Sequence, residues 1–339
     1  MLILGIETSC DETAAAVVRD GTQILSNVVA SSQQMHAASG GIIPENAARE
    51  QIKAIIPVIK ESLAISHSSL DAIAVTVGPG LIGSLLVGVD TAKTLAYAWN
   101  RPIVPVNHLV GHIYANWLLP TTNYQLPTFP ALILLVSGGH TELILMKDHG
   151  EFSLLGGTRD DASGECFDKC ARLLNLGYPG GPAIEAAASQ QSTVNSQQSI
   201  KLPRPMINSK NFDFSFSGLK TAVANLTRTY NLEPSHCAFE IQEAITDVLV
   251  AKAIRAAEKY AVNNILLAGG VAANKRLREK FKEKLATSYE LQATSFFVPE
   301  FRLCTDNAAY IASAAFFNYH PIPWQDIQAD PGLTIDNQT

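Results

Sequence analysis

The chain has 339 residues, of which 47% are hydrophobic and 17% charged, and its formal net charge at pH 7 is -6. This composition is typical of a folded globular protein with room for two domains, and it excludes a disordered or fibrous chain. The acidic balance argues against a generally basic nucleic-acid binder, but it leaves room for a local basic surface or a basic partner.

The N-terminal residues contain no basic region, and Glu7 and Asp11 interrupt the first apolar run, so we expect no secretory signal peptide. The most hydrophobic stretch, 72–98, contains Pro79 and Asp90 and predicts buried core elements rather than a membrane span. The five cysteines form no CxxC pair, which predicts reduced thiols. We therefore expect a cytoplasmic protein without a membrane segment.

In chain order, the first thirty residues predict a meander of three short strands, because apolar runs are separated by turn residues such as Asp20-Gly21. Helical and strand patterns then alternate, and the last helix of this half carries His108 and His112. The expected strands are 2–6, 13–18, 23–29, 72–77 and 103–106, and the expected helices before the histidines are 45–63 and 82–99.

The segment from Ala131 repeats this design, with three strands first and helices dominating from 163 to 260. A repeat this long is not a solenoid unit, so it predicts two duplicated domains, each with a mixed sheet covered by helices. We place the domains at 1–129 and 130–325, with a tail at 326–339, and expect a surface loop at 189–207. The later expected elements are strands 132–136, 141–146, 151–155, 264–268 and 295–298, and helices 272–285 and 305–318.

A polar loop joins the first two strands in both halves, at residues 7–12 and 137–140. The glycines of Ser137-Gly138-Gly139-His140 would let backbone N–H groups approach an anionic ligand, although a plain hairpin turn would also use them. Two α/β lobes that each open in this way resemble the actin/hexokinase/Hsp70-like ATPase fold, in which two duplicated lobes with mixed sheets enclose an interlobe cleft for a nucleotide.

Three further positions offer polar groups to a nucleotide, and two of them have a structural alternative. Asn274 follows the turn Gly269-Gly270 and could present a donor and an acceptor to a base or ribose. Glu185 follows a second glycine turn and either accepts ribose hydroxyls or complements a helix dipole. Asp168, on an expected helix, is equally compatible with a solvated helix face.

His108 and His112 are one helical turn apart, so both imidazoles can project from one face and hold one metal ion. Leu109 stands where a zinc protease with the H-E-x-x-H motif carries the glutamate that acts as general base. A metal here would therefore position and polarise a substrate rather than activate water for peptide hydrolysis. Asp306 either caps the expected last helix or offers a carboxylate oxygen to that metal.

Seven ordered motifs span about residues 2–317. They are GIETSCDET at 5–13, the pair His108 and His112, VSGGHT at 136–141, YPGGP at 178–182, FDFSFSGLK at 212–220, GGVAAN at 269–274 and CTDN at 304–307. In this order and spacing they resemble the catalytic subunit of the bacterial tRNA N6-adenosine threonylcarbamoyltransferase family, formerly described as a glycoprotease. No motif position departs from the family pattern.

The resemblance implies an actin-like fold and transfer of threonylcarbamoyl from threonylcarbamoyl-AMP to the N6 amine of adenosine 37 in tRNAs that read ANN codons. It implies one iron ion (Fe2+) per subunit, with zinc (Zn2+) as the alternative, bound by His108, His112 and Asp306. Asp11 would lie closest to the chemistry, as a base or as an orienting group. The residues implied for the adenylate are Leu135, Val136, Ser137, Gly138, Gly139, Asp168, Gly181, Glu185 and Asn274.

The implied partners are tRNA, an inactive paralogue that shares the fold and a small P-loop ATPase, while a homodimer is left open. Binding of tRNA needs local positive charge, because its affinity comes largely from phosphate neutralisation. Candidate basic groups are Lys275, Arg276, Arg278, Lys280, Lys282 and Lys284, with Lys201, Arg204 and Lys210 as a second set. A solvated helix face and an ordinary polar loop explain these two sets equally well.

Two rival functions fit the same fold. A small-molecule kinase would transfer phosphate from ATP with an acidic residue and magnesium, and it would give the two histidines no role. A non-catalytic scaffold paralogue would be expected to lack the histidine pair, which this chain has.

Overall fold

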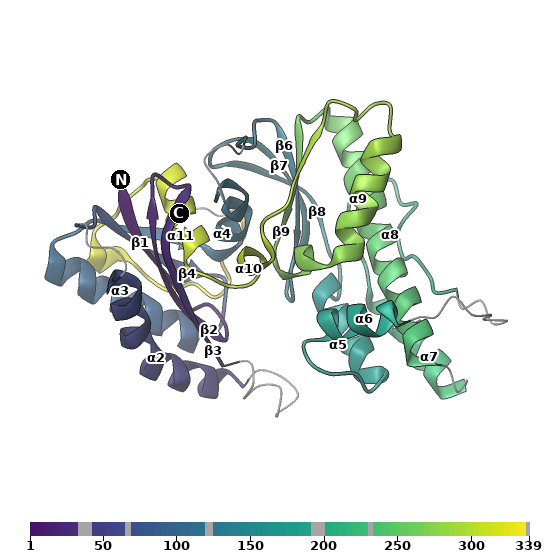
Figure 1. Ribbon diagram of the computed structural model, residues 1–339, viewed down its shortest axis with the longest axis horizontal. Helices are drawn as coiled ribbons and strands as arrows, with labels where there is room; N and C mark the ends of the chain where they lie inside the picture. The colour runs from purple at the N-terminus through teal and green to yellow at the C-terminus, as the bar shows by residue number, and fades with distance from the viewer. Residues whose placement is uncertain (33–42, 65–68, 119–124, 191–200, 230–232, 337–339) are drawn as a thin grey trace. The chain divides into compact units, whose positions relative to one another are not determined.

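Each half of the chain forms one five-stranded sheet (Figure 1). The strands of the first sheet are β1 (Leu2–Glu7), β2 (Glu12–Arg19), β3 (Gln23–Ser31), β4 (Ala72–Gly78) and β5 (Ile103–Asn107). Those of the second are β6 (Ala131–Val136), β7 (Thr141–Asp148), β8 (Glu151–Gly157), β9 (Asn264–Ala268) and β10 (Ser295–Phe297). Their orders, β3-β2-β1-β4-β5 and β8-β7-β6-β9-β10, are equivalent, which confirms the predicted duplication.

The central strand of each sheet explains its mixed character. β1 pairs antiparallel with β2 and parallel with β4, and β6 pairs in the same way with β7 and β9. Every residue of β1 and β6 is buried, and this burial on both faces explains their unbroken apolar runs. Because β1, β4 and β5 run parallel, their carboxyl ends meet at one edge of the sheet, where Glu7 and Asn107 are found.

The computed structural model describes residues 1–32, 43–64, 69–118, 125–190, 201–229 and 233–336, so residues 191–200 of the expected surface loop lie outside the described residues. Within these ranges no helix is long and apolar enough to cross a membrane. The helices are α2 (Pro44–Ala64), α3 (Ile82–Trp99), α4 (His108–Tyr114), α5 (Ser163–Leu173), α6 (Gly180–Ser189), α7 (Ser217–Thr229), α8 (Pro234–Tyr260), α9 (Lys275–Thr287), α10 (Phe301–Cys304) and α11 (Ala309–Phe317), with 3-10 turns η1 (Ala115–Trp117), η2 (Gly270–Ala273) and η3 (Trp324–Asp326).

The chain divides into two compact units whose bounds differ from the predicted domains. The first unit gathers Met1–Pro127, Asp148–Phe152 and Pro299–Thr339, and the second comprises Thr128–Lys147 and Ser153–Val298. The predicted division at 325 and the separate tail at 326–339 are therefore corrected, since the chain returns to the first unit at Pro299.

Packing in the first unit explains this return. α11 packs against α4 and β1. A Cβ on Gly5 of β1 would stand 2.2 Å from the carbonyl oxygen of Ala308, so glycine allows the C-terminal segment to approach the strand closely. In the predicted tail, Ile327 and Leu333 are buried in the same core as β1.

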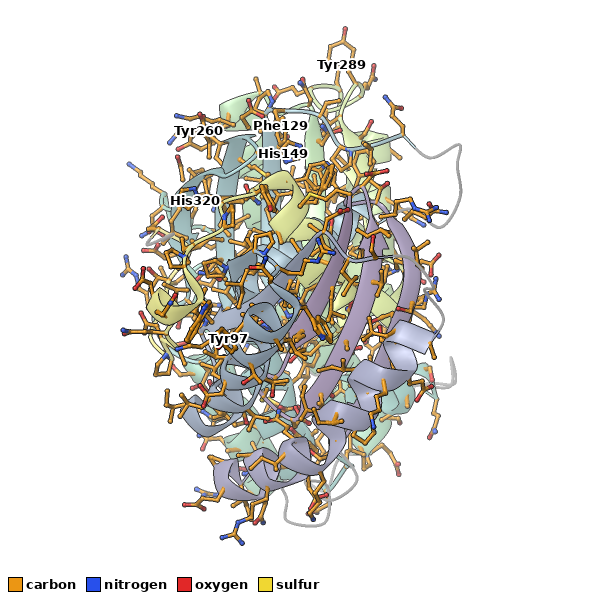
Figure 2. The ribbon with its side chains drawn as sticks, turned by 90° about the vertical axis from the view of Figure 1, so that its left-hand side faces the viewer. Tyr97, Phe129, His149, Tyr260, Tyr289 and His320 are labelled. Carbon is orange, nitrogen blue, oxygen red and sulfur yellow. The ribbon has the colours of Figure 1, made fainter. Side chains whose placement is uncertain are left out.

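The tip of the hairpin between β7 and β8 also belongs to the first unit. The ring of His149, labelled in Figure 2, stacks on Phe317 with centroids 4.5 Å apart. Its Nδ1 lies 2.9 Å from the hydroxyl of Tyr114. Aromatic stacking and this hydrogen bond explain why Asp148–Phe152, at the tip of the hairpin, belongs to the first unit.

Two predicted helices begin later than expected, and both corrections involve an asparagine. The predicted helix 272–285 is divided at Asn274, which is extended and accepts a hydrogen bond from the Leu277 N–H, so η2 ends there and α9 begins. The predicted helix 305–318 begins only at Ala309, because the Asn307 side chain accepts from the Ala309 N–H. Asn307 thus performs the capping that the sequence left open for Asp306.

Candidate metal centre and nucleotide-binding turns

His108 and His112 lie on α4 with Asp306 opposite them, all in the first unit. Asn107 starts this helix at the end of β5, since its side chain accepts a hydrogen bond from the Leu109 N–H at 2.8 Å. The Asp306 carboxylate lies 3.2 Å from Nε2 of His112 and 3.7 Å from Nε2 of His108. One nitrogen or oxygen atom from each residue lies within 4.8 Å of the others, so the three can share one ion.

Glu7 holds the far side of the His108 ring. This carboxylate is fully buried at the end of β1, where it accepts hydrogen bonds from the Ser9 N–H and the Thr76 hydroxyl, both at 2.5 Å. Its Oε2 also lies 3.1 Å from Nδ1 of His108. The ring is therefore oriented with Nδ1 toward Glu7 and Nε2 toward Asp306, an arrangement that is common behind metal-binding histidines.

Tyr310 holds Asp306 in a similar manner. It is the second residue of α11, and its hydroxyl donates to the Asp306 carboxylate at 3.3 Å. Its buried ring packs 4.7 Å from the ring of His112, centroid to centroid. A Cβ on Gly111 would approach this ring to 2.7 Å, so the glycine between the two histidines leaves room for the tyrosine.

The electrostatics of this group favour a protonated His108 beside ionised Asp306. Burial disfavours the imidazolium, but the carboxylates of Glu7 and Asp306 outweigh it and raise the pKa of His108 to about 9. Burial lowers the pKa of His112 despite its hydrogen bond to Asp306. Although burial opposes the shift, His108 and His112 hold the pKa of Asp306 well below its usual value.

The donor set fits a transition-metal ion. Two imidazoles and one carboxylate are ligands that iron and zinc both accept. Acidic groups crowd the surroundings of Asp306. Burial and the nearby carboxylates of Asp306 and Asp11 raise the pKa of Glu12 to about 10. A cation would offset this excess of negative charge. Nδ1 of His112 is buried and has no hydrogen-bond partner among the described residues, so its ring presents Nε2 to Asp306 without a second polar anchor.

Asp11 lies in the loop between β1 and β2, in the same unit as the candidate metal ligands. In the described part of the chain it lines an open pocket of about 390 Å³ together with Thr13, Ser32 and Gln51. The hydroxyl and N–H of Ser32 both donate to its backbone carbonyl. The Asp11 carboxylate is hydrogen-bonded with Cys10 and Glu12 of the same loop. The hydroxyl of Ser9, in the same loop, lies 3.2 Å from Nδ1 of His108.

In the second unit, the turn after β6 contains two glycines that packing does not require. Leu135 and Val136 are buried at the end of the strand, and the Ser137 carbonyl accepts from the Gly164 N–H. A Cβ added at Gly138 or Gly139 would meet nothing within 4 Å. The fold therefore does not require glycine there for space, whereas a ligand that approaches the backbone would.

The other candidate adenylate residues of the second unit are Asp168, Gly181, Glu185 and Asn274, and hydrogen bonds link three of them to neighbouring turns and helices. The Asp168 carboxylate accepts from the Gly180 N–H at 2.7 Å, and the space beside Gly181 is open. The Glu185 carboxylate accepts from the Lys275 N–H at 3.0 Å. The Asn274 side chain is committed on both sides, since its amide donates to Gln242 and its oxygen caps α9. It acts as a support in this structure, and the turn offers a ligand its backbone.

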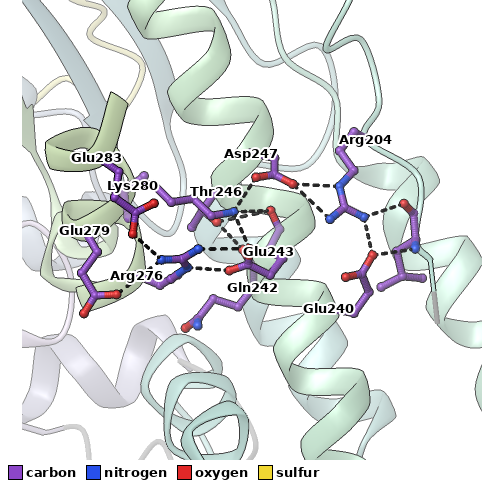
Figure 3. Close-up of polar contacts among 12 residues, drawn as sticks. Arg204, Glu240, Gln242, Glu243, Thr246, Asp247, Arg276, Glu279, Lys280 and Glu283 are labelled. Carbon is purple, nitrogen blue, oxygen red and sulfur yellow. Dashed lines mark hydrogen bonds and ion pairs between the residues drawn. The ribbon is translucent and has the colours of Figure 1, made fainter. Parts of the chain in front are cut away.

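Three of the nine candidate basic residues, Arg204, Arg276 and Lys280, pair with acids on α8 (Figure 3). Lys280 is buried and lies 2.9 Å from Glu243 and 2.5 Å from Asp247, and Arg276 binds Glu243 at 2.7 Å. Arg204 of the second set binds Glu240 and lies 3.0 Å from Asp247. These three residues form one structural ion-pair network with the acids of α8. Lys275, Lys282 and Lys284 of the first set, and Lys201 and Lys210 of the second, remain exposed.

Sequence reasoning did not single out Glu7, Glu12, Gln51 or Tyr310. The density of acids in GIETSCDET was a usable signal for the two glutamates. Gln51 lies on a helix of mixed polar and apolar residues and Tyr310 on an apolar one, and neither carried such a signal. The five cysteines are free thiols, as expected.

Solved structures with the same architecture assign the chain to the actin- and hexokinase-like ATPase fold. HypF from T. kodakarensis has a TM-score of 0.58 at 15% identity, covering 94% of this chain and 47% of that one. Component A of the (R)-2-hydroxyglutaryl-CoA dehydratase of Acidaminococcus fermentans has a TM-score of 0.51 at 14% identity, covering 94% and 98%. At these identities the likeness shows the fold alone.

The sequence comparisons are more specific. The family model for tRNA N6-adenosine threonylcarbamoyltransferase (TsaD) matches residues 23–313. A protein of that name from Geobacillus thermodenitrificans is 49% identical, covering 98% of this chain and 96% of its own length. One from Dehalococcoides mccartyi is 51% identical, covering 94% of each. The chain belongs to the tRNA N6-adenosine threonylcarbamoyltransferase family.

Proposed function

We propose that this protein transfers the threonylcarbamoyl group of threonylcarbamoyl-AMP to the N6 amine of adenosine 37 in tRNAs that read ANN codons. The observation that carries the proposal is the group formed by His108, His112 and Asp306, backed by the buried Glu7, in a chain of this family. In the reaction, a bond forms between N6 and the carbamoyl carbon while the bond from that carbon to the phosphate oxygen breaks. AMP leaves, and the amine loses one proton.

The adenylate is assigned to the turns of the second unit. The open space beside Gly138, Gly139 and Gly181 supports this, because backbone N–H groups there can reach phosphate oxygens without hindrance from a side chain. Glu185 can accept from ribose hydroxyls through the oxygen that does not cap α9. Since the acyl carbon of the adenylate is already activated, positioning supplies much of the rate.

His108, His112 and Asp306 are assigned to an iron ion, with zinc as the alternative. When bound, such an ion would act as a Lewis acid that attracts oxygen atoms of the threonylcarbamoyl group. Glu7 holds Nδ1 of His108 and thereby keeps Nε2 directed at Asp306. Tyr310 restrains the Asp306 carboxylate from the opposite side.

Asp11 is assigned to the attacking amine. Its place in the pocket wall supports this, because a carboxylate there can accept the proton that N6 loses or hold the amine in line. The target base lies in a single-stranded loop of tRNA, so it can enter a pocket without unpairing a duplex.

The contact with tRNA is assigned in part to the exposed end of α9. Lys282 and Lys284 are exposed there, and Tyr289, whose exposed fraction is 86%, projects from the segment that follows (Figure 2). A cation beside an exposed aromatic ring suits phosphate contact and base stacking. A tRNA substrate would also place the protein in the cytoplasm.

The paralogous subunit and the P-loop ATPase remain proposed partners. Exposed apolar side chains on α2 and α3, including Ile52, Ile56, Ile82 and Leu86, support a protein partner on these helices. They support equally a homodimer through the same surface.

The direct test supplies tRNA, threonylcarbamoyl-AMP and candidate partner subunits, and then analyses the digested nucleosides by mass. We expect threonylcarbamoyladenosine from the wild-type protein and none from His108→Ala, which should remain folded by circular dichroism. Phosphorylation of a small molecule by ATP without any nucleoside product would favour the kinase instead. Absence of product together with tight binding to an active paralogue would favour the scaffold.

A further inference from the structure

Gln51 of α2 connects this helix to the loop that carries Asp11. Its side chain is 1% exposed, and its Nε2 lies 3.3 Å from the Thr8 carbonyl oxygen, 3.0 Å from that of Cys10 and 3.0 Å from that of Glu12. One amide nitrogen thus lies within hydrogen-bond distance of every second carbonyl of this turn, at residues 8, 10 and 12.

The chemistry of the loop fixes the orientation of this amide. Three carbonyl oxygens need a donor, so Nε2 must face them, and the reversed amide would place Oε1 against three acceptors in a buried setting. Oε1 is buried and has no hydrogen-bond partner among the described residues. Within the described residues, the hydrogen bonds of Gln51 therefore all go to the loop.

The other hydrogen bonds to the loop each hold one carbonyl group. The Ser84 hydroxyl donates to the Cys10 carbonyl at 3.1 Å, and the Leu81 N–H donates to that of Ser9 at 2.8 Å. Ser32 holds the Asp11 carbonyl itself through its hydroxyl and its N–H. Among the described residues, Gln51 reaches both ends of the turn, at residues 8 and 12, and it lines the same pocket as Asp11. The position of the Asp11 side chain therefore depends on Gln51 as well as on Ser32.

We propose that Gln51 is a positioning residue for the transfer reaction, which fixes the turn 8–12 from behind and so holds Asp11 against the acceptor amine. This inference rests on the proposed function and on the role of Asp11 within it. Gln51 itself touches no reacting atom. A displacement of about 1 Å in a group that meets the substrate can reduce a rate about 100-fold, so loss of this anchor should act on turnover more than on binding.

Gln51→Leu keeps the size of the side chain and removes its donors. We expect kcat for nucleoside formation to fall by about 10-fold to 100-fold, with KM for threonylcarbamoyl-AMP within about twofold of wild type. The matched control is Ser62→Ala, on the same helix and equally buried, because Ser62 bonds to Ser26 of β3 and not to the loop. The control should lose stability and keep kcat. Equal losses of kcat in both variants would overturn the proposal.

A second readout is independent of turnover. Cys10 lies in the turn and is partly exposed, whereas Cys166, Cys170, Cys237 and Cys304 are buried, so its alkylation reports on the loop. Iodoacetamide labelling, followed by peptide mass analysis at one pH, should be about 10-fold faster in Gln51→Leu than in wild type or Ser62→Ala. An unchanged Cys10 rate overturns the proposal whatever the activity. No product from the wild-type protein would instead overturn the proposed function, and full activity of Asp11→Ala would overturn only the role of Asp11.

Gln51→Glu adds a test that a merely structural role would not pass. A carboxylate facing three carbonyls repels them, while the protonated acid regains one donor. The activity of this variant, divided by that of wild type at each pH, should rise as the pH falls from 8 to 6, and the same ratio for Gln51→Leu should stay flat. A flat ratio for Gln51→Glu counts against the proposal.

Discussion

The Glu7 carboxylate lies 3.1 Å from Nδ1 of His108, and the same ring directs Nε2 at Asp306, 3.7 Å away. A buried carboxylate thus selects which nitrogen of the imidazole remains available. In metal sites such partners fix the tautomer and raise the basicity of the ligand, and their loss typically reduces affinity 10-fold to 100-fold.

Replacing Glu7 by Gln should weaken iron or zinc binding by about 10-fold, because the neutral amide can still accept from Nδ1 but no longer supplies charge. Chelator competition on the purified protein measures this. Glu50→Gln serves as the control, since Glu50 pairs with Lys53 on the surface of α2. Equal metal affinity in the Glu7→Gln and Glu50→Gln proteins would show that Glu7 does not support the site.

Without metal, the stability of the protein should depend on pH through His108. Burial disfavours the imidazolium, yet Glu7 and Asp306 raise the pKa of His108 from 6.5 to about 9. Because the folded state binds this proton more tightly, the stabilisation is complete below about pH 6.5 and is lost as the pH rises through 9. The shift corresponds to about 3 kcal/mol in the free energy of unfolding.

Urea denaturation in the presence of a chelator, at pH 6 and at pH 9.5, tests this dependence. The loss of stability between the two should be smaller in His108→Gln than in wild type. Identical losses would exclude His108 as the source. Added metal should reverse the dependence in wild type, since binding through Nε2 competes with the proton there.

Glycine variants should separate binding from folding in the second unit. Gly139→Ala should leave the melting temperature within about 2 °C of wild type, because a Cβ there meets nothing within 4 Å, yet weaken adenylate binding. Gly164→Ala is the counterpart, because its Cβ would stand 2.5 Å from the Ser137 carbonyl oxygen, and it should unfold at lower temperature. Thermal melts and titration with a non-hydrolysable adenylate analogue measure both. Unchanged affinity in Gly139→Ala would contradict the assignment of this turn.

Two lysines of α9 should behave differently although they are only four positions apart. Lys280→Met removes one of the two basic partners of the partly buried Glu243 and Asp247, which keep Arg276 and Arg204, and should lower the free energy of unfolding by about 2 kcal/mol. Lys284→Met should change it by less than about 0.5 kcal/mol. If the exposed end of α9 contacts tRNA, only Lys284→Met should reduce the salt dependence of tRNA binding, by about one unit of slope. Equal slopes in wild type and Lys284→Met would move the contact elsewhere.

The sequence predicted the architecture well because the relevant signals are local. Apolar runs, turn residues and the repeated meander predicted both sheets, and the strand Asn264–Ala268 and the helix Ile82–Trp99 were predicted to the residue. The predictions were wrong where an asparagine side chain decided the start of a helix. Asn274 and Asn307 each cap their helix by bonds that depend on backbone conformation, which spacing alone does not show.

The ion pairs of the basic residues were also not predictable from the sequence pattern. Their number on α9 was visible in the sequence, but Glu243 and Asp247, the partners of Arg276 and Lys280, come from α8, about thirty residues earlier in the chain. Pairing across helices placed these two residues in a structural network and left Lys275, Lys282 and Lys284 exposed.

By itself the sequence determined the duplicated α/β fold, the family and the one-turn spacing of His108 and His112, because hydrophobic period and motif order are properties of the linear chain. Only the tertiary structure brought Asp306 back to the first unit and set buried Glu7 behind His108. It also showed that Gln51 holds the loop of Asp11. These contacts join residues more than forty positions apart, and they arise from how strands and helices pack, which no local pattern encodes.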